Sequence, residues 1–228
     1  ENVTALDRAA IEKGVRLRVL IEVNTGMNRA GLEPGEPTLA LAQKIAPLQG
    51  VQLAGLMTWE SHALSIQDID EKRRVVAEAL QRFTETAQIC RDAGIPMEIL
   101  SCGGTGTYWI STVQPGITEI QAGGGIFMDT FYPSAMDVRG LEQALTILTT
   151  IVSHPAPDRA YMDAGRKTTY GAFSLPEVKD LPGLKVTALS AEHGYLEIAE
   201  DGNPVKIGDK IELISGYSDM TVFLHNHL

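Results

Sequence analysis

The sequence has little of what an exported, membrane-bound or nucleic-acid-binding protein needs. It contains only two cysteines, Cys90 and Cys102, which excludes a disulfide framework and is typical of a reducing, cytoplasmic compartment. The 19 basic side chains are outnumbered by 29 acidic ones, and the longest basic cluster is Lys72-Arg73-Arg74. This balance argues against nucleic acid and anionic membranes as partners. No apolar run approaches the roughly 18 residues that would span a bilayer.

What remains is an ordinary globular composition. The 228 residues are 44% hydrophobic and 21% charged, with a formal net charge of -10. The length suits one large domain, or one domain with a smaller companion. The first residue is Glu1 and not methionine, so we expect the chain to be processed or to be a piece of a longer protein.

Compact apolar runs alternate with helix-like patterns over the first two-thirds of the chain. Strand-like runs cover residues 17–23, 52–57, 97–100 and 117–121, and helices are predicted near 7–14, 38–45 and 66–93. In the longest helix, apolar residues recur every three or four positions from Val76 to Cys90. Strands that recur behind helices predict an α/β fold with a parallel sheet. We favour a (β/α)8-type barrel over a doubly wound sheet.

The pattern changes from about residue 133. The β-branched run 145–152 favours a strand, and short strands are predicted at 185–190, 195–199 and 209–214, separated by turn residues. We therefore expect an α/β-barrel portion over residues 1–138, which would bind any cofactor, and a C-terminal antiparallel β domain over 139–228.

The glycine-rich segment Ser101–Thr107 follows a predicted strand and precedes a predicted helix. Glycines let the backbone approach an anion, and unpaired N–H groups at a helix start favour negative charge. A phosphate held by these N–H groups and by the hydroxyl of Thr105 or Thr107 is one interpretation. A tight strand-to-helix turn without a ligand is the other.

Three further side chains follow predicted strands, where parallel α/β folds place their active sites. Arg29 lies between two glycines and can donate hydrogen bonds to an anionic oxygen, or can pair with a surface carboxylate. Trp59 and His62 can flank a flat ligand and move a proton, although a structural histidine is the simpler alternative.

Potential metal ligands occur near the C-terminus. Asp219, His225 and His227 carry the right donor atoms, although histidines in a terminal tail often have no function.

In order along the chain, these segments resemble one family, the pyridoxal-phosphate enzymes of the D-threonine aldolase and eukaryotic-type D-serine dehydratase group, which are relatives of alanine racemase. The resemblance covers nearly the whole chain. It rests on the segments Thr25–Gly31, Gly55–His62, Gly103–Thr107, Thr118–Glu119, Gly123–Asp129, Asp163–Lys167 and Glu192–Gly194 and on the segment around Asp219.

The resemblance implies aldol cleavage or dehydration of a β-hydroxy D-amino acid by a homodimer, with an N-terminal barrel that binds pyridoxal 5'-phosphate. Gly103, Gly104 and Thr105 would bind the cofactor phosphate. Trp59 would lie in the cofactor site. Arg29 and His62 would lie at the cofactor ring and serve in catalysis. Asp219 would bind a divalent metal (Mn, Mg or Zn).

The sequence departs from the family pattern at the metal site. Tyr217 stands where the family usually has the first metal ligand, a histidine, and a protonated phenol is a poor ligand. Trp59 also replaces a usual tyrosine, and Ser61 replaces a glycine. The metal and the contacts to the substrate therefore stay open.

The family's Schiff-base lysine on the first barrel strand has no counterpart. Lys13 and Lys44 are predicted on helix surfaces, and Lys167 matches a motif of the second domain. A complete barrel alone needs about 250 residues. We therefore expect the first part of the barrel, with the lysine, to be absent here and the isolated chain to be inactive. An amino-acid racemase-like enzyme and a non-catalytic cofactor-binding homologue are the alternatives.

Overall fold

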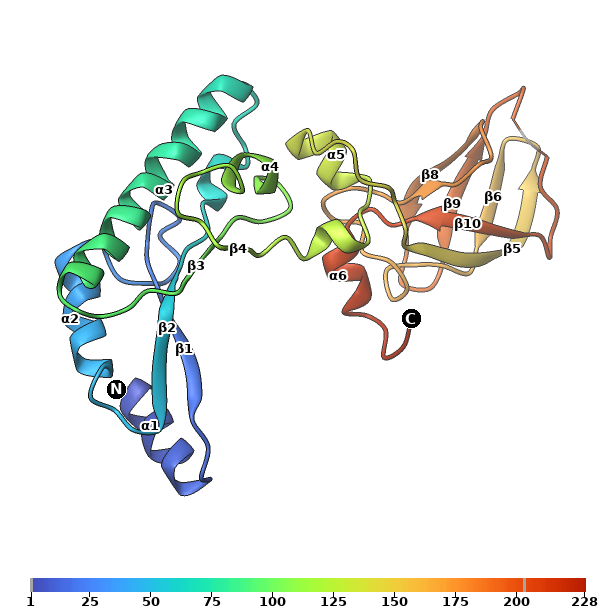
Figure 1. Ribbon diagram of the computed structural model, residues 1–228. Helices are drawn as coiled ribbons and strands as arrows, with labels where there is room; N and C mark the ends of the chain where they lie inside the picture. The colour runs from blue at the N-terminus through green and yellow to red at the C-terminus, as the bar shows by residue number, and fades with distance from the viewer. Residues whose placement is uncertain (1, 203) are drawn as a thin grey trace. The chain divides into compact units, whose positions relative to one another are not determined.

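The computed structural model describes residues 2–202 and 204–228. The chain forms two compact units, Glu1–Gly123 and Gly124–Leu228, whose elements are labelled in Figure 1. The domain boundary that we expected after residue 138 falls inside the second unit. Hydrogen bonds of Asp129, Thr130 and Tyr132 tie segment 124–138 to residues 215–219. Each unit is described by itself below.

The first unit contains a four-stranded parallel sheet (Figure 1). Its strands are β1 (Leu17–Glu22), β2 (Val51–Met57), β3 (Ile99–Cys102) and β4 (Glu119–Ile120). They pair in the order β1-β2-β3-β4, each parallel to the next. A doubly wound sheet reverses its strand order at a switch point, whereas a barrel adds strands in sequence. The predicted barrel-type α/β portion is therefore confirmed.

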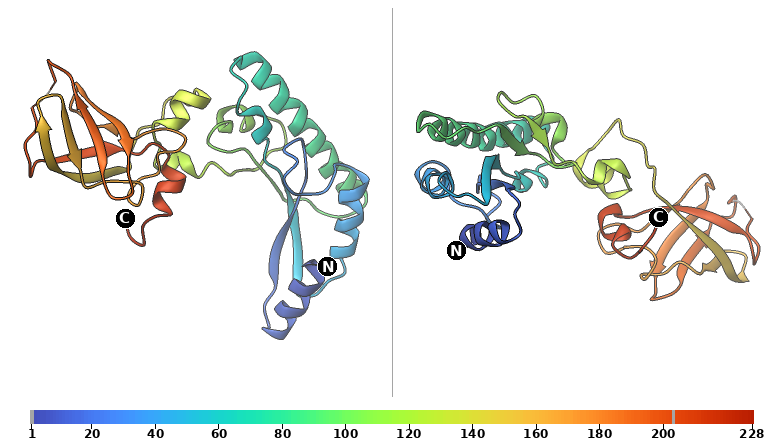
Figure 2. Two further views of the ribbon diagram at one scale, coloured as in Figure 1. Left: turned by 180° about the vertical axis from the view of Figure 1, so that it is seen from behind. Right: turned by 60° about the horizontal axis from the view of Figure 1, so that its bottom comes forward.

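Helices cover this sheet. They are α1 (Asn2–Glu12), α2 (Glu36–Ile45), α3 (Ile69–Asp92) and α4 (Tyr108–Ser111), with a 3-10 turn η1 (Ser61–Ala63). Figure 2 shows α2 next to the C-terminal part of α3, and the two helices are in contact. The longest helix, α3, begins where the Asp68 side chain accepts the Glu71 N–H at 2.8 Å and ends before Gly94, whose φ is 79°.

The apolar face of α3 fills the core of the first unit. The predicted periodic residues Val76, Leu80 and Phe83 are all buried and pack with Leu56 and Leu100 of the sheet. Burying a side chain of this size contributes about 1.5–3 kcal/mol. This packing fixes the sheet and thus the loops at its carboxyl edge.

The second unit contains an antiparallel sheet, as predicted, and this sheet has six strands. Its strands are β5 (Thr146–Ala156), β6 (Arg159–Met162), β7 (Glu177–Val178), β8 (Leu184–Leu189), β9 (Gly194–Ile198) and β10 (Lys210–Ile214). They pair in the order β7-β10-β5-β6-β9-β8. Buried and exposed residues alternate along β9, and Leu196 packs in the core with Ile151 and Leu213. The sequence did not predict β6 and β7.

Asp129 joins two short helices of the second unit, α5 (Phe131–Met136) and α6 (Ser218–Val222). Its Oδ1 accepts the N–H groups of Phe131 and Tyr132, both at 2.9 Å, and its Oδ2 accepts the Ser218 N–H at 2.7 Å. The side chain is completely buried. One carboxylate therefore caps both helices and holds residues 131–132 beside residue 218.

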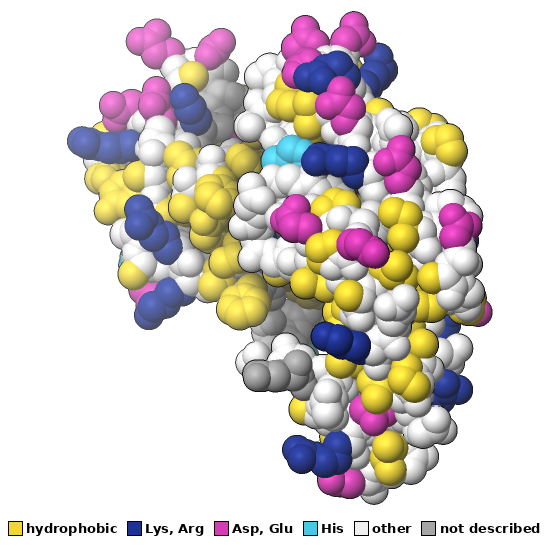
Figure 3. Space-filling view, turned by 90° about the vertical axis from the view of Figure 1, so that its left-hand side faces the viewer, with side chains coloured by type: hydrophobic (Ala, Val, Ile, Leu, Met, Phe, Trp, Pro, Cys, Tyr) yellow, Lys and Arg dark blue, Asp and Glu magenta, His cyan; other side chains and the backbone are white. Residues whose placement is uncertain are grey.

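The distribution of charged side chains and the state of the two cysteines match what the composition predicts. Acidic and basic side chains are interspersed on the face seen in Figure 3. Within residues 2–202 and 204–228, no helix is long and apolar enough to cross a bilayer. Cys90 and Cys102 are both buried, free thiols.

Candidate active site

Three loops of the first unit carry the residues that the sequence singled out. Arg29 follows β1, Trp59 and His62 follow β2, and the glycine-rich segment 103–107 follows β3. The three strands are parallel neighbours, so these loops leave the sheet at the same edge.

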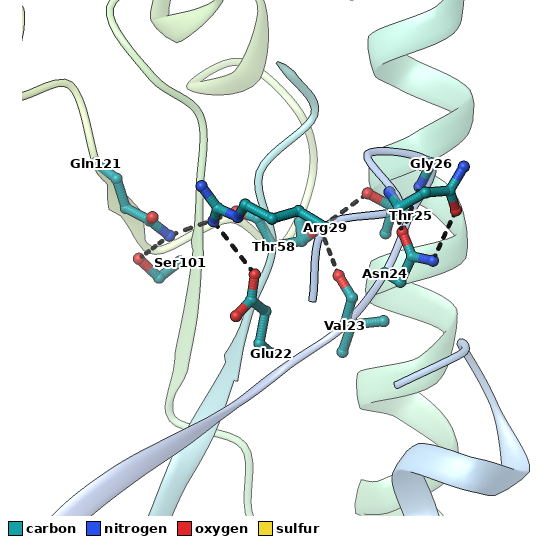
Figure 4. Close-up of polar contacts among 10 residues, drawn as sticks. Glu22, Val23, Asn24, Thr25, Gly26, Arg29, Thr58, Ser101 and Gln121 are labelled. Carbon is teal, nitrogen blue, oxygen red and sulfur yellow. Dashed lines mark hydrogen bonds and ion pairs between the residues drawn. The ribbon is translucent and has the colours of Figure 1, made fainter. Parts of the chain in front are cut away.

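The loop after β1 is fixed by a buried pair of threonines. Thr58 Oγ1 donates to the Val23 carbonyl at 2.8 Å, and the Thr25 hydroxyl lies 2.8 Å from Thr58 Oγ1, to which it donates (Figure 4). Arg82 of α3 donates to the Thr25 carbonyl at 2.7 Å. The loop that presents Arg29 is thereby tied to both β2 and α3.

Arg29 lies over the Trp59 ring. Its guanidinium carbon is 5.3 Å from the centroid of the indole. Its Nη2 is 3.4 Å from Glu22 Oε1, as Figure 4 shows. A cation on an aromatic face gains about 0.5–1 kcal/mol at exposed sites. The structure thus brings together two of the predicted residues and holds a permanent positive charge against a flat surface.

His62 packs against the first of these loops. A Cβ on Gly26 would lie 2.8 Å from both Cε1 and Nε2 of the imidazole, so a larger residue would displace the ring, and the φ of 140° also favours glycine. Burial lowers the pKa of His62, with a further lowering by Arg82, while Glu60 acts in the opposite direction. At neutral pH the imidazole is therefore uncharged and able to accept a proton.

Trp59 also contacts the glycine-rich loop. A Cβ on Gly104 would lie 2.6 Å from Trp59 Nε1. That indole nitrogen and His62 Nδ1 are both buried, and neither has a hydrogen-bond partner in the described part of the chain. Buried polar atoms without partners are uncommon and point to an additional partner such as a ligand.

The glycine-rich loop is organised by a residue that the sequence did not single out, Glu60. Its Oε2 accepts the Gly103 N–H at 3.2 Å, and its Oε1 accepts the hydroxyls of Thr107 at 2.7 Å and Ser111 at 2.5 Å. The Gly104 N–H donates to Thr107 Oγ1 at 3.3 Å. The N–H groups of Gly103 and Gly104 are therefore bonded within the protein. No sequence signal marked Glu60 beyond its place between Trp59 and His62.

Cys102 precedes this loop and is a buried, free thiol. Burial raises the pKa of its thiol well above the ordinary value, and the charge of Glu60 raises it further. The thiolate form is thereby suppressed at neutral pH.

In the second unit, Asp219 is surrounded by phenols. Tyr132 donates to Asp219 Oδ2 at 2.8 Å, and Tyr217 donates to the same oxygen at 3.0 Å. Burial, the main cause, and the neighbouring Asp219 raise the pKa of Tyr217 to about 12. Three more aromatic rings extend the cluster, those of Phe131, Tyr170 and Phe173.

This donor set does not fit a divalent metal. Neutral phenols are poor ligands, and one carboxylate alone is a weak site. Among the described residues no group of three or more histidine, cysteine, aspartate or glutamate side chains is placed to hold a metal ion. His225 Nε2 instead lies 2.8 Å from the Thr168 carbonyl oxygen.

Two of the lysines hold the surface positions predicted for them. Lys13 and Lys44 are exposed. Lys167 is in the second unit and pairs with Glu192 at 2.5 Å.

Comparisons with known proteins find similarity over the whole chain. The family described as "Alanine racemase, N-terminal domain" matches residues 1–131, and the family described as "Putative serine dehydratase domain" matches residues 144–228. A D-threonine aldolase from an Arthrobacter species is 33% identical over 230 residues, which cover 100% of this chain and 60% of that protein. A 3-hydroxy-D-aspartate aldolase from Paracoccus denitrificans is 28% identical and covers 99% of this chain and 60% of its own length.

A comparison with solved structures finds the same kind of relative. The crystal structure of D-threonine aldolase from Filomicrobium marinum is similar with a TM-score of 0.88 and 30% identity, over 98% of this chain and 62% of that one. The chain thus spans about three-fifths of the length of these relatives.

Proposed function

Because the chain belongs to the alanine racemase N-terminal domain family, we propose that the full-length protein binds pyridoxal 5'-phosphate and cleaves or dehydrates a small β-hydroxy D-amino acid. The names of its relatives, a D-threonine aldolase and a 3-hydroxy-D-aspartate aldolase, support this substrate class. The observation that carries the proposal is the group of Arg29, Trp59, His62 and Gly104 at one edge of the parallel sheet.

The residues at this edge fit the cofactor. A Cβ at Gly26 would collide with the ring of His62, and a Cβ at Gly104 with the ring of Trp59. The absence of a side chain at these two glycines therefore lets both rings pack directly against the backbone. Trp59 Nε1 and His62 Nδ1 are buried without partners in the described chain, and Arg29 supplies positive charge. A flat, anionic heteroaromatic ligand matches this combination of a ring face, a cation and unused polar atoms.

When bound, pyridoxal phosphate supplies a sink for the electrons released at the Cα of an amino acid. Arg29 would lie at the ring as a permanent cation, oriented by Trp59 and Glu22. His62, which is neutral at pH 7, would accept or hold a proton on an imidazole nitrogen. Trp59 would cover part of the site and exclude water.

The glycine-rich loop would bind the phosphate of the cofactor. We predicted Gly103, Gly104 and Thr105 for this role, and Thr105 is buried within the loop. The N–H groups of Gly103 and Gly104 are bonded to Glu60 and Thr107, so these glycines would act by allowing close approach of the backbone.

The metal that the resemblance implies is not part of this proposal. Asp219 carries two phenol hydrogen bonds in place of a second metal ligand, so no step is assigned to a metal there. We also propose, from the family resemblance, that the full-length protein is a homodimer. Sedimentation velocity measures its oligomeric state. A cytoplasmic location is likewise proposed, with the two buried free thiols in its support.

The test uses the full-length protein loaded with pyridoxal phosphate. We expect D-threonine to yield glycine and acetaldehyde, or D-serine to yield pyruvate, with the L-enantiomers as matched controls. Borohydride reduction of the loaded protein should retain the cofactor covalently. A protein that retains no cofactor and turns over neither D-amino acid contradicts the proposal.

Racemisation is a second candidate, because a reaction at Cα alone needs no metal on a β-hydroxyl. The replacement of the first metal ligand, a histidine, by Tyr217, whose phenol donates to Asp219, favours it. Incubation with L-alanine and chiral chromatography distinguish the two, since a racemase produces D-alanine and an aldolase does not.

A further inference from the structure

Glu60 is a charged side chain in the core of the first unit. It is completely buried, with 0% of its surface exposed. A buried carboxylate is costly unless donors surround it, and Glu60 has three, the Gly103 N–H and the hydroxyls of Thr107 and Ser111. These bonds connect the end of β2 with the loop after β3 and with α4.

Resting on the proposed function, we propose that Glu60 is a positioning residue that preforms the loop 103–107 for the phosphate of the cofactor. An ionised carboxylate only accepts hydrogen bonds, so the Thr107 hydroxyl must donate to it. The lone pairs of Thr107 Oγ1 are then available to the Gly104 N–H. A single charge thereby sets the direction of a chain of hydrogen bonds through the loop.

The backbone of the loop is held at the same place. Gly103 has a φ of 73°, and a Cβ there would lie 3.2 Å from the Cβ of Ser111, which itself donates to Glu60. The N–H groups of Gly103 and Gly104 are therefore turned into the protein. This assigns direct contact with the phosphate to the residues after Gly104, with Thr105 first among them.

A glutamine at position 60 has nearly the same shape but different hydrogen bonding. Its amide offers one acceptor oxygen, while its NH2 group faces either the hydroxyls or the Gly103 N–H. If the NH2 group faces the Gly103 N–H, two donors meet; if it faces the hydroxyls, Thr107 and Ser111 must turn to accept, which reverses the direction of these hydrogen bonds. In either orientation Glu60→Gln disrupts the network that holds the loop. Asp7→Asn is the matched control, since Asp7 Oδ1 accepts the Gly50 N–H at 2.6 Å in the contact between α1 and the start of β2.

The experiment compares pyridoxal phosphate with pyridoxal, which lacks the phosphate, as ligands of the full-length wild type and both variants. We expect Glu60→Gln to weaken the binding of pyridoxal phosphate at least about tenfold, the equivalent of about 1.4 kcal/mol. The affinity for pyridoxal should stay nearly unchanged. Asp7→Asn should bind both as the wild type does. An equal loss for both ligands shows general damage to the site and overturns the proposal, as does unchanged affinity.

Hydrogen exchange of the ligand-free protein separates this inference from the proposed function. We expect faster exchange in the peptide covering residues 101–111 of Glu60→Gln and not of Asp7→Asn. If the wild type binds neither ligand, the proposed function fails, and with it the role in phosphate binding. Unchanged exchange in Glu60→Gln would show that the carboxylate does not hold the loop at all.

Discussion

Tyr217 donates its phenolic hydrogen to Asp219 Oδ2 across 3.0 Å, from a position two residues earlier in the chain. Tyr132 donates to the same oxygen at 2.8 Å. The carboxylate that the family pattern marks as a metal ligand is thus already satisfied by two neutral donors. Its coordination chemistry is set by the side chain at position 217.

A single substitution at this position should create a metal site. In Tyr217→His an imidazole replaces the phenol two residues before Asp219, which gives a nitrogen and an oxygen donor on the same side of the chain. We expect Mn²⁺ or Zn²⁺ to bind Tyr217→His at least about tenfold more tightly than the wild type, measured by isothermal titration calorimetry.

Tyr217→Phe is the control for this experiment. It removes the same hydroxyl but adds no ligand, so it should bind the metals no better than the wild type does. A wild type that binds Mn²⁺ as tightly as Tyr217→His, and loses this affinity in Asp219→Asn, would show that the phenol cluster does hold a metal.

Arg29 should matter for activity and little for stability. Its side chain is 50% exposed and its ion pair with Glu22 is long, so the pair contributes at most about 1 kcal/mol. We expect Arg29→Ala to lower kcat/KM at least about tenfold and to move Tm by no more than about 4 °C. Arg29→Lys keeps the charge without the planar group and should recover only part of the rate. Full activity in Arg29→Ala would remove Arg29 from the site.

Much of the fold could be predicted because its main elements carry their own signals. Apolar periodicity marks α3, and compact apolar runs mark β1 and β2. The elements that were missed are short, such as β7 with two residues and α6 with five. Their stability comes from distant partners, since Asp129 accepts the Ser218 N–H 89 positions later in the chain. A local pattern cannot contain that information.

The candidate site shows the same difference between residues with a local sequence signal and residues that depend on distant partners. Arg29, Trp59 and His62 could be predicted to lie at one edge of the sheet because each follows a strand, and parallel strands bring their ends together. Glu60 was not found, because its burial depends on donors 43 to 51 positions away. A glutamate in a sequence is normally exposed, and only the tertiary structure shows the exception.

The lowered pKa of His62 should make the free energy of unfolding depend on pH. Burial lowers the pKa of its imidazole below the ordinary value of 6.5, so the unfolded chain binds more protons than the folded one between the two pKa values. Stability from this group is present above about pH 6.5 and is lost as the pH falls further. We expect the Tm of the wild type to fall more steeply than that of His62→Gln between about pH 7 and about pH 5. Parallel curves for the two proteins would show that His62 titrates normally.

Asp129 should be a large contributor to the stability of the second unit. In Asp129→Asn one oxygen becomes an NH2 group, which leaves an N–H of residues 131, 132 or 218 facing a donor. We expect the free energy of unfolding to fall by about 2–3 kcal/mol, measured by urea denaturation. Asp158→Asn is the control, because the Asp158 side chain is 76% exposed and lies 3.9 Å from Arg159. Equal stability of the two variants would contradict the double cap.

Gly104→Ala tests the contact between the glycine-rich loop and Trp59. The added methyl group would lie 2.6 Å from Trp59 Nε1, so either the indole or the loop must move. Overpacking of this kind costs about 1–3 kcal/mol. We expect a lower Tm, a shifted tryptophan fluorescence spectrum and weaker binding of pyridoxal phosphate. Gly123→Ala is the matched control, because a Cβ at Gly123 meets no atom within 4 Å. If Gly104→Ala keeps the stability and fluorescence of Gly123→Ala, the indole does not rest on the loop, and the grouping of Trp59 with residues 103–107 is wrong.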